Sequence, residues 1–423
     1  MSTPDINRTI DAVWRIESAR VIAGLARIVR DVGIAEELAQ DALVAALKQW
    51  PETGVPDNPG AWLMAAAKHR AIDNLRRRTL LERKHAEIGR DLAEQERAIP
   101  DLEAALDDHV GDDLLRLVFV SCHPILSTEA RVALTLRLLG GLTTDEIARA
   151  FLVSESTVAQ RIVRAKKALS EARVAFEVPR GSELVARLAS VLEVIYLIFN
   201  EGYAATAGND WTRPALCEEA LRLGRILAEL APEEPEVHGL VAMMEIQASR
   251  LNARVGPTGE PILLLEQDRS RWDQLLIRRG FAAIARAAAQ RQPPGAYAVQ
   301  AAIAACHARA RVAEETDWAR IASLYEALAA ISPSPVIELN RAVALGMAYG
   351  PEAGLALADE LADEPSLKNY YVLPTVRGDL LEKLGRFDEA RAEFERAASL
   401  TRNVREQEVL RGRAAKLSER KSR

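Results

Sequence analysis

The side chains best suited to chemistry lie within residues 142–169, where long polar groups recur at helical spacing. If a helix begins near residue 155, one face carries side chains that can hydrogen-bond to base edges: Ser156, Thr157, Gln160, Arg161, Arg164 and Lys167. The opposite face is apolar, with Val158, Ile162, Ala165 and Leu169. Such a helix fits the DNA major groove, where Arg and Gln can form paired hydrogen bonds with guanine and adenine. The pattern favours reading of double-stranded DNA, and an ordinary solvated helix face is the alternative.

The residues just before this face carry the signals of a helix-turn-helix. Thr143 and Glu146 form a capping box that starts a first helix, and Ser154 can cap the second. Ile147 and Ala148 would face inward, and the small Ala148 would let the two helices cross closely. Two short helices around a tight turn are the arrangement that places the second helix in the major groove.

A second basic segment lies upstream, at residues 61–78, with the sequence "AWLMAAAKHRAIDNLRRR". Its first aromatic residue is Trp62, and polar side chains follow at helical spacing: Lys68, Arg70, Asn74, Arg77 and Arg78. An aromatic ring beside basic residues suits contact with unstacked bases, since stacking contributes roughly 1–3 kcal/mol per base. The alternatives are a core position for Trp62 and, for residues 76–78, a helix end stabilised by the helix dipole.

The sequence shows no pattern typical of catalysis or metal binding. Its six histidines do not form H-E-x-x-H, and no phosphate-cradling G-x-x-x-x-G-K-[ST] is present. Cys122, Cys217 and Cys306 lie far apart, which predicts reduced thiols in a cytoplasmic protein. We therefore expect no enzymatic activity, no metal and no cofactor.

The composition predicts an all-α protein that does not span a membrane. Apolar residues make up 49% of the 423 residues, and Ala and Leu dominate over β-branched and aromatic types. Apolar spacing predicts amphipathic helices over residues 11–50 with a break at Gly33, and Ser127 is a candidate N-cap further on. No apolar run approaches 18 residues, and the N-terminus lacks a signal-peptide layout.

The formal net charge of −6 conceals strong local contrasts. Residues 61–90 carry eight basic side chains against three acidic ones, and residues 156–173 carry five against one. Between them, residues 91–113 carry nine acidic side chains against one basic. Because phosphate binding depends on local charge, the acidic total does not exclude nucleic acid. The acidic stretch at 91–112 is predicted to be a linker.

The chain beyond Gly181 contains weak internal repeats. Three similar segments end at Leu230, Ile331 and Leu400, at intervals of 101 and 69 residues. These intervals are close to three and two units of the 34-residue tetratricopeptide repeat. The last copy has small and aromatic residues where that repeat needs close helix packing: Gly378, Gly385, Phe387, Ala390, Phe394 and Ala397. The pattern predicts an α-solenoid of tetratricopeptide-like helices, with an irregular helical bundle as the alternative.

The order of these parts resembles the extracytoplasmic-function (ECF) sigma factors of bacterial RNA polymerase, within the sigma-70 family. The resemblance rests on "IAEELAQDALVAAL", the Trp-led basic segment, the acidic linker and the helix-turn-helix, in that order. Further on, "YLIFNEGYAA" and "SPSPVIELNRAVAL" resemble the C-terminal extension of a subgroup that carries a tetratricopeptide-like domain. The resemblance implies region 2 at 10–90, the acidic linker at 91–112, region 4 at 113–175 and a regulatory helical domain at 181–423.

The resemblance also implies partners and residue roles. Region 2 would bind the β′ clamp of the polymerase core through Glu37, Leu38, Gln40 and Asp41. The segment from Trp62 to Arg78 would capture and melt the −10 promoter element. Residues 142–169 would read the −35 element and contact the β flap. Lys68-His69 departs from the Arg-Asn that is more common in the family at that point.

The sequence therefore predicts a sigma factor that directs RNA polymerase to promoters. The alternative is a helix-turn-helix regulator with a repeat-type sensor that is not a polymerase subunit, but such a protein has no use for the region 2 motifs. The C-terminal domain would restrain the DNA-binding domains, be required for activity, or bind a regulatory protein or peptide in a concave groove. Within it, "NEGY" at 200–203 is predicted to cap a helix with Gly202 in the turn, and contact with the N-terminal domains is the alternative.

Overall fold

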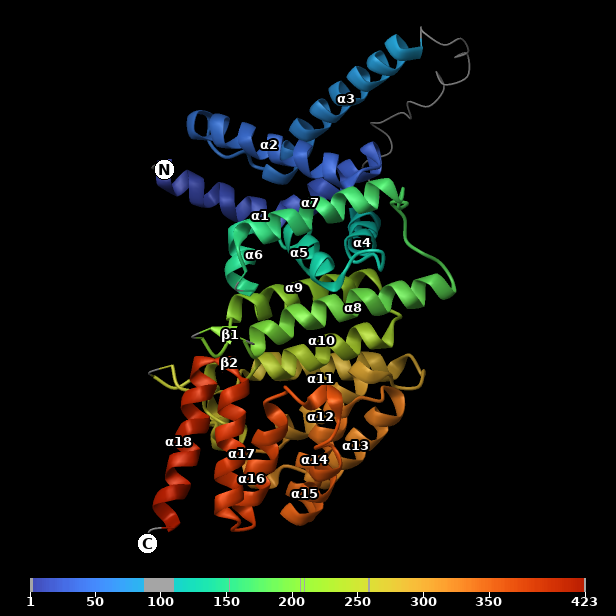
Figure 1. The fold of residues 1–423 in the computed structure, drawn as a ribbon. Coiled ribbons are helices and arrows are strands. Elements are labelled where there is room, and N and C mark those ends of the chain that lie inside the picture. The colour runs from blue at the N-terminus through green and yellow to red at the C-terminus, as the bar shows by residue number, and fades with distance from the viewer. Residues whose placement is uncertain are drawn as a thin grey trace. The chain divides into compact units, whose positions relative to one another are not determined.

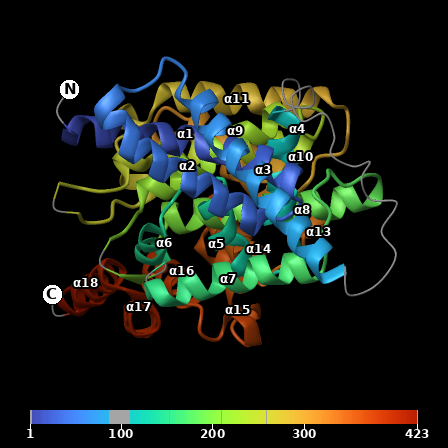
Figure 2. The ribbon, with the colours of Figure 1, turned by 90° about the horizontal axis from the view of Figure 1, so that it is seen from above.

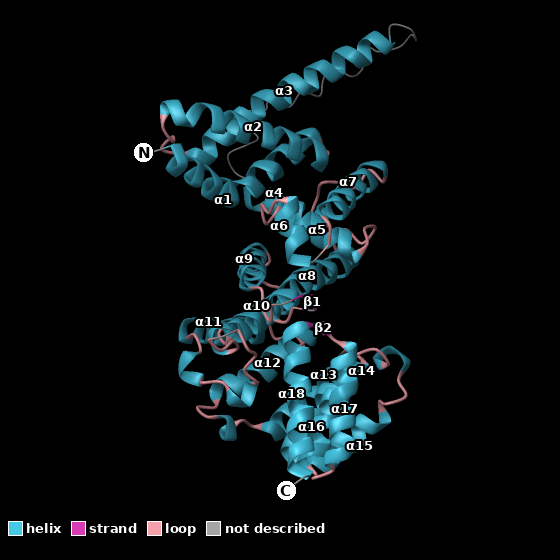
Figure 3. Ribbon diagram, turned by 60° about the vertical axis from the view of Figure 1, so that its left-hand side comes forward, coloured by secondary structure: helices cyan, strands magenta, loops and turns pink. Residues whose placement is uncertain are grey.

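The computed structural model describes the backbone of residues 3–86, 110–151, 153–205, 207–208, 210–257 and 259–421. The chain forms two compact units, Met1–Ile195 and Tyr196–Arg423. Regular structure in the described residues is almost entirely helical, and the strands β1 (Ala207–Gly208) and β2 (Arg402–Asn403) have two residues each (Figure 3). The predicted all-α class is confirmed.

The first unit begins with three helices that pack against one another (Figures 1 and 2): α1 (Thr3–Val29), α2 (Val32–Thr53) and α3 (Pro59–Ala86). The predicted break at Gly33 is wrong by two residues. Asp31 ends the break, because its Oδ1 accepts hydrogen bonds from the backbone N–H groups of Gly33 and Ile34 at 2.8 and 3.0 Å. Gly33 therefore lies in the first turn of α2. Asp31 occupies the N-cap position before that turn, where Asp is favoured.

A stripe of alanines along α2 sets how closely these helices approach. Ala35, Ala39, Ala42 and Ala46 are all fully buried and recur at three- and four-residue intervals. Large apolar side chains from the neighbouring helices, including Leu25 and Leu63, fill the core beside them. Burying a side chain of that size contributes roughly 1.5–3 kcal/mol, so these leucines are a main source of the bundle's stability.

The second part of this unit contains four helices: α4 (Val110–Ser121), α5 (Thr128–Leu138), α6 (Thr144–Phe151) and α7 (Glu155–Glu171). Ser127 caps α5 as predicted, and its Oγ accepts from the N–H of Ala130 at 3.3 Å. α5 packs against both α6 and α7, and α6 packs against α7. The acidic residues predicted to form a linker lie outside the described residues up to position 109, and α4 begins at Val110.

The next helix, α8 (Ser182–Tyr203), begins at the predicted boundary near Gly181, whereas the two compact units divide inside it, after Ile195. Two polar contacts hold its first half to the end of α4. Arg187 donates to the carbonyl oxygen of Phe119 at 2.9 Å, and Ser190 donates to that of Cys122 at 2.7 Å. Residues 182–195 therefore belong structurally to the first unit.

The second unit continues with a series of helices, each packed on the next along the chain: α9 (Pro214–Leu230), α10 (Pro235–Ala248), α11 (Gln274–Ala289), α12 (Ala296–Arg309), α13 (Trp318–Ile331), α14 (Pro335–Tyr349), α15 (Pro351–Glu360), α16 (Val372–Lys383), α17 (Phe387–Leu400) and α18 (Val404–Lys421). Short 3₁₀ turns lie in the connections. The three aligned repeat positions, Leu230, Ile331 and Leu400, are each the last residue of a helix.

Glycines give the last helices the close packing that the repeat pattern predicted. A Cβ on Gly378 of α16 would lie 2.7 Å from Cε1 of Phe394, so only glycine leaves room for that buried ring. Gly385 turns the chain between α16 and α17 with a φ of 75°, which favours glycine.

The two ends of the second unit meet through β1 and β2, which pair in parallel. Asn403 is fully buried at this junction. Its Nδ2 donates to the carbonyl oxygens of Ala205 and Asp210 at 3.0 and 2.8 Å, while its Oδ1 accepts from the N–H groups of Arg405 and Glu406. One side chain thus satisfies four backbone groups and joins segments about 200 residues apart.

Candidate nucleic-acid interface

The helix pair α6–α7 begins as the sequence predicts. The N–H of Glu146 donates to Oγ1 of Thr143 at 3.1 Å, and the N–H of Thr143 donates back to Oε2 of Glu146 at 2.8 Å. The Oγ of Ser154 accepts from the N–H of Thr157 at 3.2 Å. These bonds satisfy donors that a helix start leaves free, and each cap contributes about 1 kcal/mol.

The two faces of α7 divide as the periodicity requires. Val158, Ile162, Ala165 and Leu169 are buried, as are Ile147 and Ala148 of α6. The predicted base-reading residues Ser156, Gln160, Arg164 and Lys167 are exposed, and Thr157 and Arg161 are half-buried. α7 therefore has its apolar face packed in the unit and its polar face toward solvent.

The cations on the polar face are available to a partner. Neither Arg161 nor Arg164 forms an ion pair within the described part of the chain. The Nζ of Lys167 lies 3.6 Å from Oε1 of Glu171, and both side chains are mostly exposed. Exposed pairs of this kind contribute no more than about 0.5 kcal/mol, so phosphate can displace Glu171 easily.

Lys166, beside this face, points instead toward α2. Its ammonium pairs with Oε2 of Glu36, and the Nε of Arg137 donates to Oε1 of the same carboxylate at 2.7 Å. The Glu36 side chain is almost fully buried. Sequence reasoning missed this residue, because no local pattern distinguishes Glu36 from its exposed neighbour Glu37.

Further polar contacts connect the first helices to the helix-turn-helix. Ser170 donates to Oδ2 of Asp31 at 2.9 Å, and Arg15 of α1 pairs with Glu146 of α6. Burial raises the pKa of the Glu146 carboxyl, but the bonds from Thr143 and the charge of Arg15 outweigh it and lower that pKa below its usual range. The contact between α1–α2 and α5–α7 is thus largely ionic.

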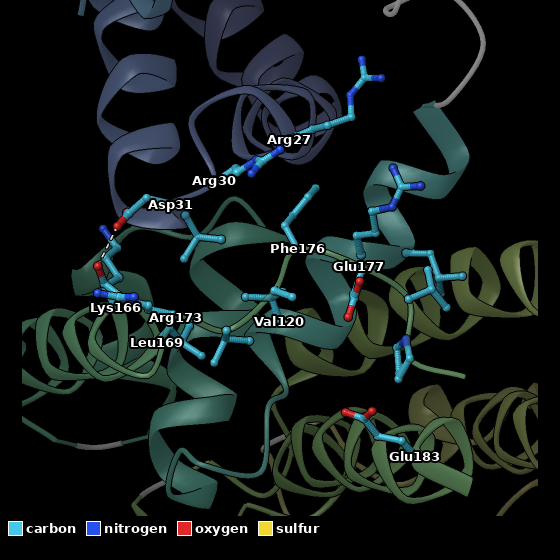
Figure 4. A pocket seen from close by; sticks show the side chains of 18 of the residues that line it. Arg27, Arg30, Asp31, Val120, Lys166, Leu169, Arg173, Phe176, Glu177 and Glu183 are labelled. Atoms are coloured by element: carbon cyan, nitrogen blue, oxygen red, sulfur yellow. Dashed lines mark hydrogen bonds between the residues drawn. The ribbon is translucent and has the colours of Figure 1, made fainter. Parts of the chain in front are cut away.

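A pocket of about 1410 Å³ lies beside this contact (Figure 4). Its charged lining is mainly basic, with Arg27, Arg30, Arg116, Lys166, Arg173 and Arg180 against Asp31, Glu177 and Glu183. Figure 4 shows Lys166 beside Asp31 at one end and Glu183 at another. Leu169, from the buried face of α7, also lines it, so the pocket is separate from the exposed polar face of α7.

Trp62 lies in the first turn of α3, whose start is fixed by Asn58 through a 3.1 Å bond from the N–H of Ala61. Its ring meets that of Trp50 edge-on, with centroids 5.3 Å apart and planes at 69°. Trp50 is fully buried, whereas Trp62 is only half-buried. The ring is thus anchored on the core and remains partly accessible.

The other residues predicted for the −10 element all lie on α3. Lys68 and Arg70 are half-buried. The side chains of Asn74, Arg77 and Arg78 lie outside the described residues, although the backbone at these positions is helical.

The predicted polymerase-binding residues lie on α2 and differ in exposure. Glu37 and Asp41 are exposed, and Gln40 is half-buried with its amide donating to Oε1 of Glu36 at 2.6 Å. Leu38 is only 5% exposed. Leu38 packs in the core of this unit. The surface of α2 beside it is therefore formed by the polar side chains of Glu37, Gln40 and Asp41.

Among the helices that the structure describes, none is both long and apolar enough to cross a bilayer. The described residues also contain no group of three or more His, Cys, Asp or Glu side chains arranged to hold a metal ion.

Comparison with protein families matches three parts of the chain. Residues 15–80 match sigma-70 region 2, and residues 116–169 match sigma-70 region 4. Residues 187–288 match a family of unknown function, DUF6596. The first two matches cover α1–α3 and the helix-turn-helix.

Comparison with individual proteins gives one long match and several shorter ones. An uncharacterized protein of Rhizobium meliloti (strain 1021) is 44% identical over 397 residues, covering 93% of this chain and 92% of the relative. A probable ECF RNA polymerase sigma factor SigI of Mycobacterium tuberculosis (strain H37Rv) is 28% identical over 185 residues, covering 42% of this chain and 60% of SigI. The ECF sigma factor SigK of Mycobacterium sp. (strain KMS) is 28% identical over 162 residues, 36% of this chain and 76% of SigK. No solved structure matches.

Proposed function

From the premise that this chain contains sigma-70 regions 2 and 4 and belongs to one family with its R. meliloti relative, we propose that it is an ECF-type sigma factor. It directs the RNA polymerase core to specific promoters and is not itself an enzyme. Its C-terminal helices modulate that activity. Sigma-70 regions have the polymerase core and promoter DNA as partners.

The observation that carries this proposal is the division of α7 into two faces. Its apolar face is buried against α5 and α6, while Gln160, Arg164 and Lys167 are exposed. A helix held in this way can enter the major groove without unfolding its support. The same unit carries a region 2 match, which a simple duplex-binding regulator does not need.

The two predicted DNA contacts suit two states of a promoter. The −35 element stays double-stranded, so the groove-reading face of α7 is assigned to it: Ser156, Thr157, Gln160, Arg161, Arg164 and Lys167. The −10 element must open, so a partly accessible ring beside a basic helix is assigned to it: Trp62, Lys68, Arg70, Asn74, Arg77 and Arg78. Unpairing costs a few kcal/mol, which base stacking and phosphate contacts offset in part.

The exposed side chains Glu37, Gln40 and Asp41 of α2 are assigned to the β′ clamp of the core, with Leu38 fixing their positions from within. The α6–α7 pair is assigned a contact with the β flap. No catalytic group and no cofactor is required, because the polymerase itself performs nucleotide addition.

The second unit is assigned to regulation as a tetratricopeptide-like array. Support comes from the helices that pack in series and from the repeat-like packing of Gly378 against Phe394. Such arrays present extended surfaces to proteins or peptides, so a regulatory protein or peptide is the partner class that we assign to it.

In vitro transcription with purified core polymerase and a genomic promoter library tests the proposal. The full-length chain is compared with a truncation after Tyr203, which keeps the contacts of Arg187 and Ser190 with α4. Core-dependent transcripts that share a promoter motif are expected from the full-length chain. Binding of duplex DNA without core-dependent transcripts would instead establish a conventional helix-turn-helix regulator.

The truncation determines the sign of the C-terminal effect. Greater output without the second unit identifies it as an inhibitor, and loss of output identifies it as a required part. Equal output from both proteins would contradict a modulating role.

A further inference from the structure

In the second unit, an arginine–aromatic cluster joins the irregular segment between α10 and α11 to the end of α8 and the loop before α9. It consists of Arg250, Arg254, Arg269, Tyr203, Trp211 and Trp272. Tyr203 is the last residue of α8, so the predicted turn at Gly202 is wrong. Gly202 is helical, and a Cβ there would lie 2.7 Å from the backbone nitrogen of Cys217. The close approach of α9 explains the glycine and places Tyr203 in the cluster.

The three guanidinium groups lie over the aromatic rings. Arg254 is 3.8 Å from the centre of the Tyr203 ring and 5.7 Å from that of Trp211. Arg250 is 5.7 Å from the Tyr203 ring and 5.6 Å from that of Trp272, and Arg269 is 4.9 Å from Trp272. Cation–π contact at these distances is favourable, but it does not replace the hydrogen bonds that a guanidinium loses when it leaves water.

Carboxylates act on the cluster only beyond ion-pair distance: the charges of Glu314 and Glu315 raise the pKa of Arg269, which burial lowers overall. None of the three arginines forms an ion pair with a carboxylate in the described part of the chain. Arg254 and Arg269 donate instead to neutral oxygens: the carbonyls of Tyr203, His307 and Ala310 and the hydroxyl of Thr316. Glu406 influences Arg254, but its carboxylate accepts hydrogen bonds from Tyr371 and Thr401.

Arg250 is the most isolated of the three. Its guanidinium has no hydrogen-bond partner among the described residues. Burial lowers its pKa below the usual value, and the positive charge of Arg254 acts in the same direction. Its side chain is only partly exposed, so it has lost part of its hydration without gaining a counter-charge in the described residues.

Unsatisfied donors gather around the same place. The Nε atoms of Arg254 and Arg269, the indole N–H groups of Trp211 and Trp272 and the hydroxyl of Tyr203 are buried without a hydrogen-bond partner. The Nδ1 of the adjacent His307 is also buried without a hydrogen-bond partner. Buried polar groups are nearly always paired in folded proteins, so these donors are suited to bind the oxygens of a ligand or of water.

We propose that the arginine–aromatic cluster binds a small anion through acceptor oxygens, a carboxylate or a phosphate, with Arg250 as its main charge partner. Guanidinium groups bind both oxyanions through paired hydrogen bonds. Anion binding would make the stability of the second unit depend on a metabolite. The inference concerns this unit alone and does not depend on the sigma-factor role.

Calorimetric titration of the full-length chain tests the site, with inorganic phosphate, adenosine monophosphate and citrate as probes and sodium chloride at equal ionic strength as reference. Saturable binding of at least one oxyanion is expected, together with a rise in Tm. Preference for phosphate and adenosine monophosphate assigns a phosphate ligand, and preference for citrate assigns a carboxylate. No response beyond that of chloride overturns the proposal.

Two substitutions separate a ligand contact from a packing role. Arg250→Met keeps contact with the rings, so it should leave the free protein as stable or more stable while weakening oxyanion binding at least tenfold. Arg279→Gln removes an exposed arginine on α11 and should change neither property. Arg250→Lys, which keeps the charge without the planar fork, should bind with intermediate affinity. Unchanged oxyanion affinity in Arg250→Met would refute the site. So would an Arg250→Lys variant that loses much of its stability but still binds the oxyanion.

Discussion

Two pairs of arginines, one pair in each unit, have opposite environments. In the first unit Arg161 and Arg164 extend from α7 without an ion pair in the described residues, whereas in the second Arg250 and Arg254 lie over aromatic rings. A cation that remains in water is free to meet phosphate and release counterions. One that lies against aromatic rings and is only partly exposed has lost some of its hydration and serves a ligand or the fold. The exposed polar groups of the first unit should therefore affect binding, and the enclosed ones of the second should affect stability.

The largest effect is expected from Arg161→Ala combined with Arg164→Ala. Loss of a base contact costs about 1–3 kcal/mol, so the pair should weaken promoter binding by roughly 2–6 kcal/mol. The measurement is fluorescence anisotropy of the holoenzyme on promoter DNA. The urea midpoint should not change, because neither side chain supports the fold. Arg279→Ala, which removes an exposed arginine of the second unit, is the control. Similar weakening of promoter binding by this variant would show that the α7 effect depends only on net charge.

Asn403→Ala is the matching change inside the second unit. It leaves four backbone groups without their partner, so it should lower the free energy of unfolding by roughly 2–4 kcal/mol. Chemical denaturation followed by circular dichroism measures this. DNA binding by the folded variant should be unchanged, and an unaltered unfolding midpoint would show that water replaces the side chain.

Glu36→Gln changes a buried charged residue of the first unit, unlike the α7 arginines compared above, which form no ion pair among the described residues. The amide keeps the shape but loses the ion pairs with Arg137 and Lys166, so the contact of α2 with α5 and α7 should weaken by about 1–3 kcal/mol. Hydrogen exchange of α7 should become faster, while exchange in α10 stays constant. Glu37→Gln, at the exposed neighbouring position, should leave both rates as they are.

His307 predicts a dependence of stability on pH in the second unit. Burial, reinforced by the charges of Arg250 and Arg269, lowers its pKa from 6.5 to about 3. Between these values the unfolded chain binds a proton that the folded chain does not. The contribution of neutral His307 to the free energy of unfolding is therefore complete above pH 6.5. It decreases as the pH falls below that value, by up to about 1.4 kcal/mol per pH unit.

His307→Gln should remove that part of the pH dependence. Urea midpoints at pH 7 and pH 5 should differ less in the variant than in the parent chain. An equal difference in both proteins would assign the acid sensitivity to other groups.

The smallest effect on stability is expected from Lys167→Gln. The exposed pair with Glu171 contributes no more than about 0.5 kcal/mol, so the unfolding midpoint should remain the same. If Lys167 contacts phosphate, the salt dependence of promoter binding should decrease by about one unit of slope. An unchanged slope would remove Lys167 from the DNA-binding face.

The local parts of the structure follow from short stretches of sequence. Thr143, Glu146 and Ser154 cap helices as predicted, because the groups that bond lie within three residues of one another. The apolar face of α7 is buried as its spacing requires. Two local predictions are wrong, those at Gly33 and Gly202. Gly202 is helical because α9 passes close to it, and a short stretch of sequence does not show that contact.

What the sequence by itself determined is the all-α class, the order of the two DNA-binding segments and the side chains that α7 exposes. The tertiary structure alone decided that Glu36 joins α2 to α5 and α7, that Asn403 closes the second unit and that three arginines meet around aromatic rings. Glu36 and Arg137 are 101 residues apart, and Asn403 and Ala205 are 198 apart. Capping and helical periodicity are set by neighbours along the chain, whereas the pairing of buried polar groups depends on which distant segments the fold brings together.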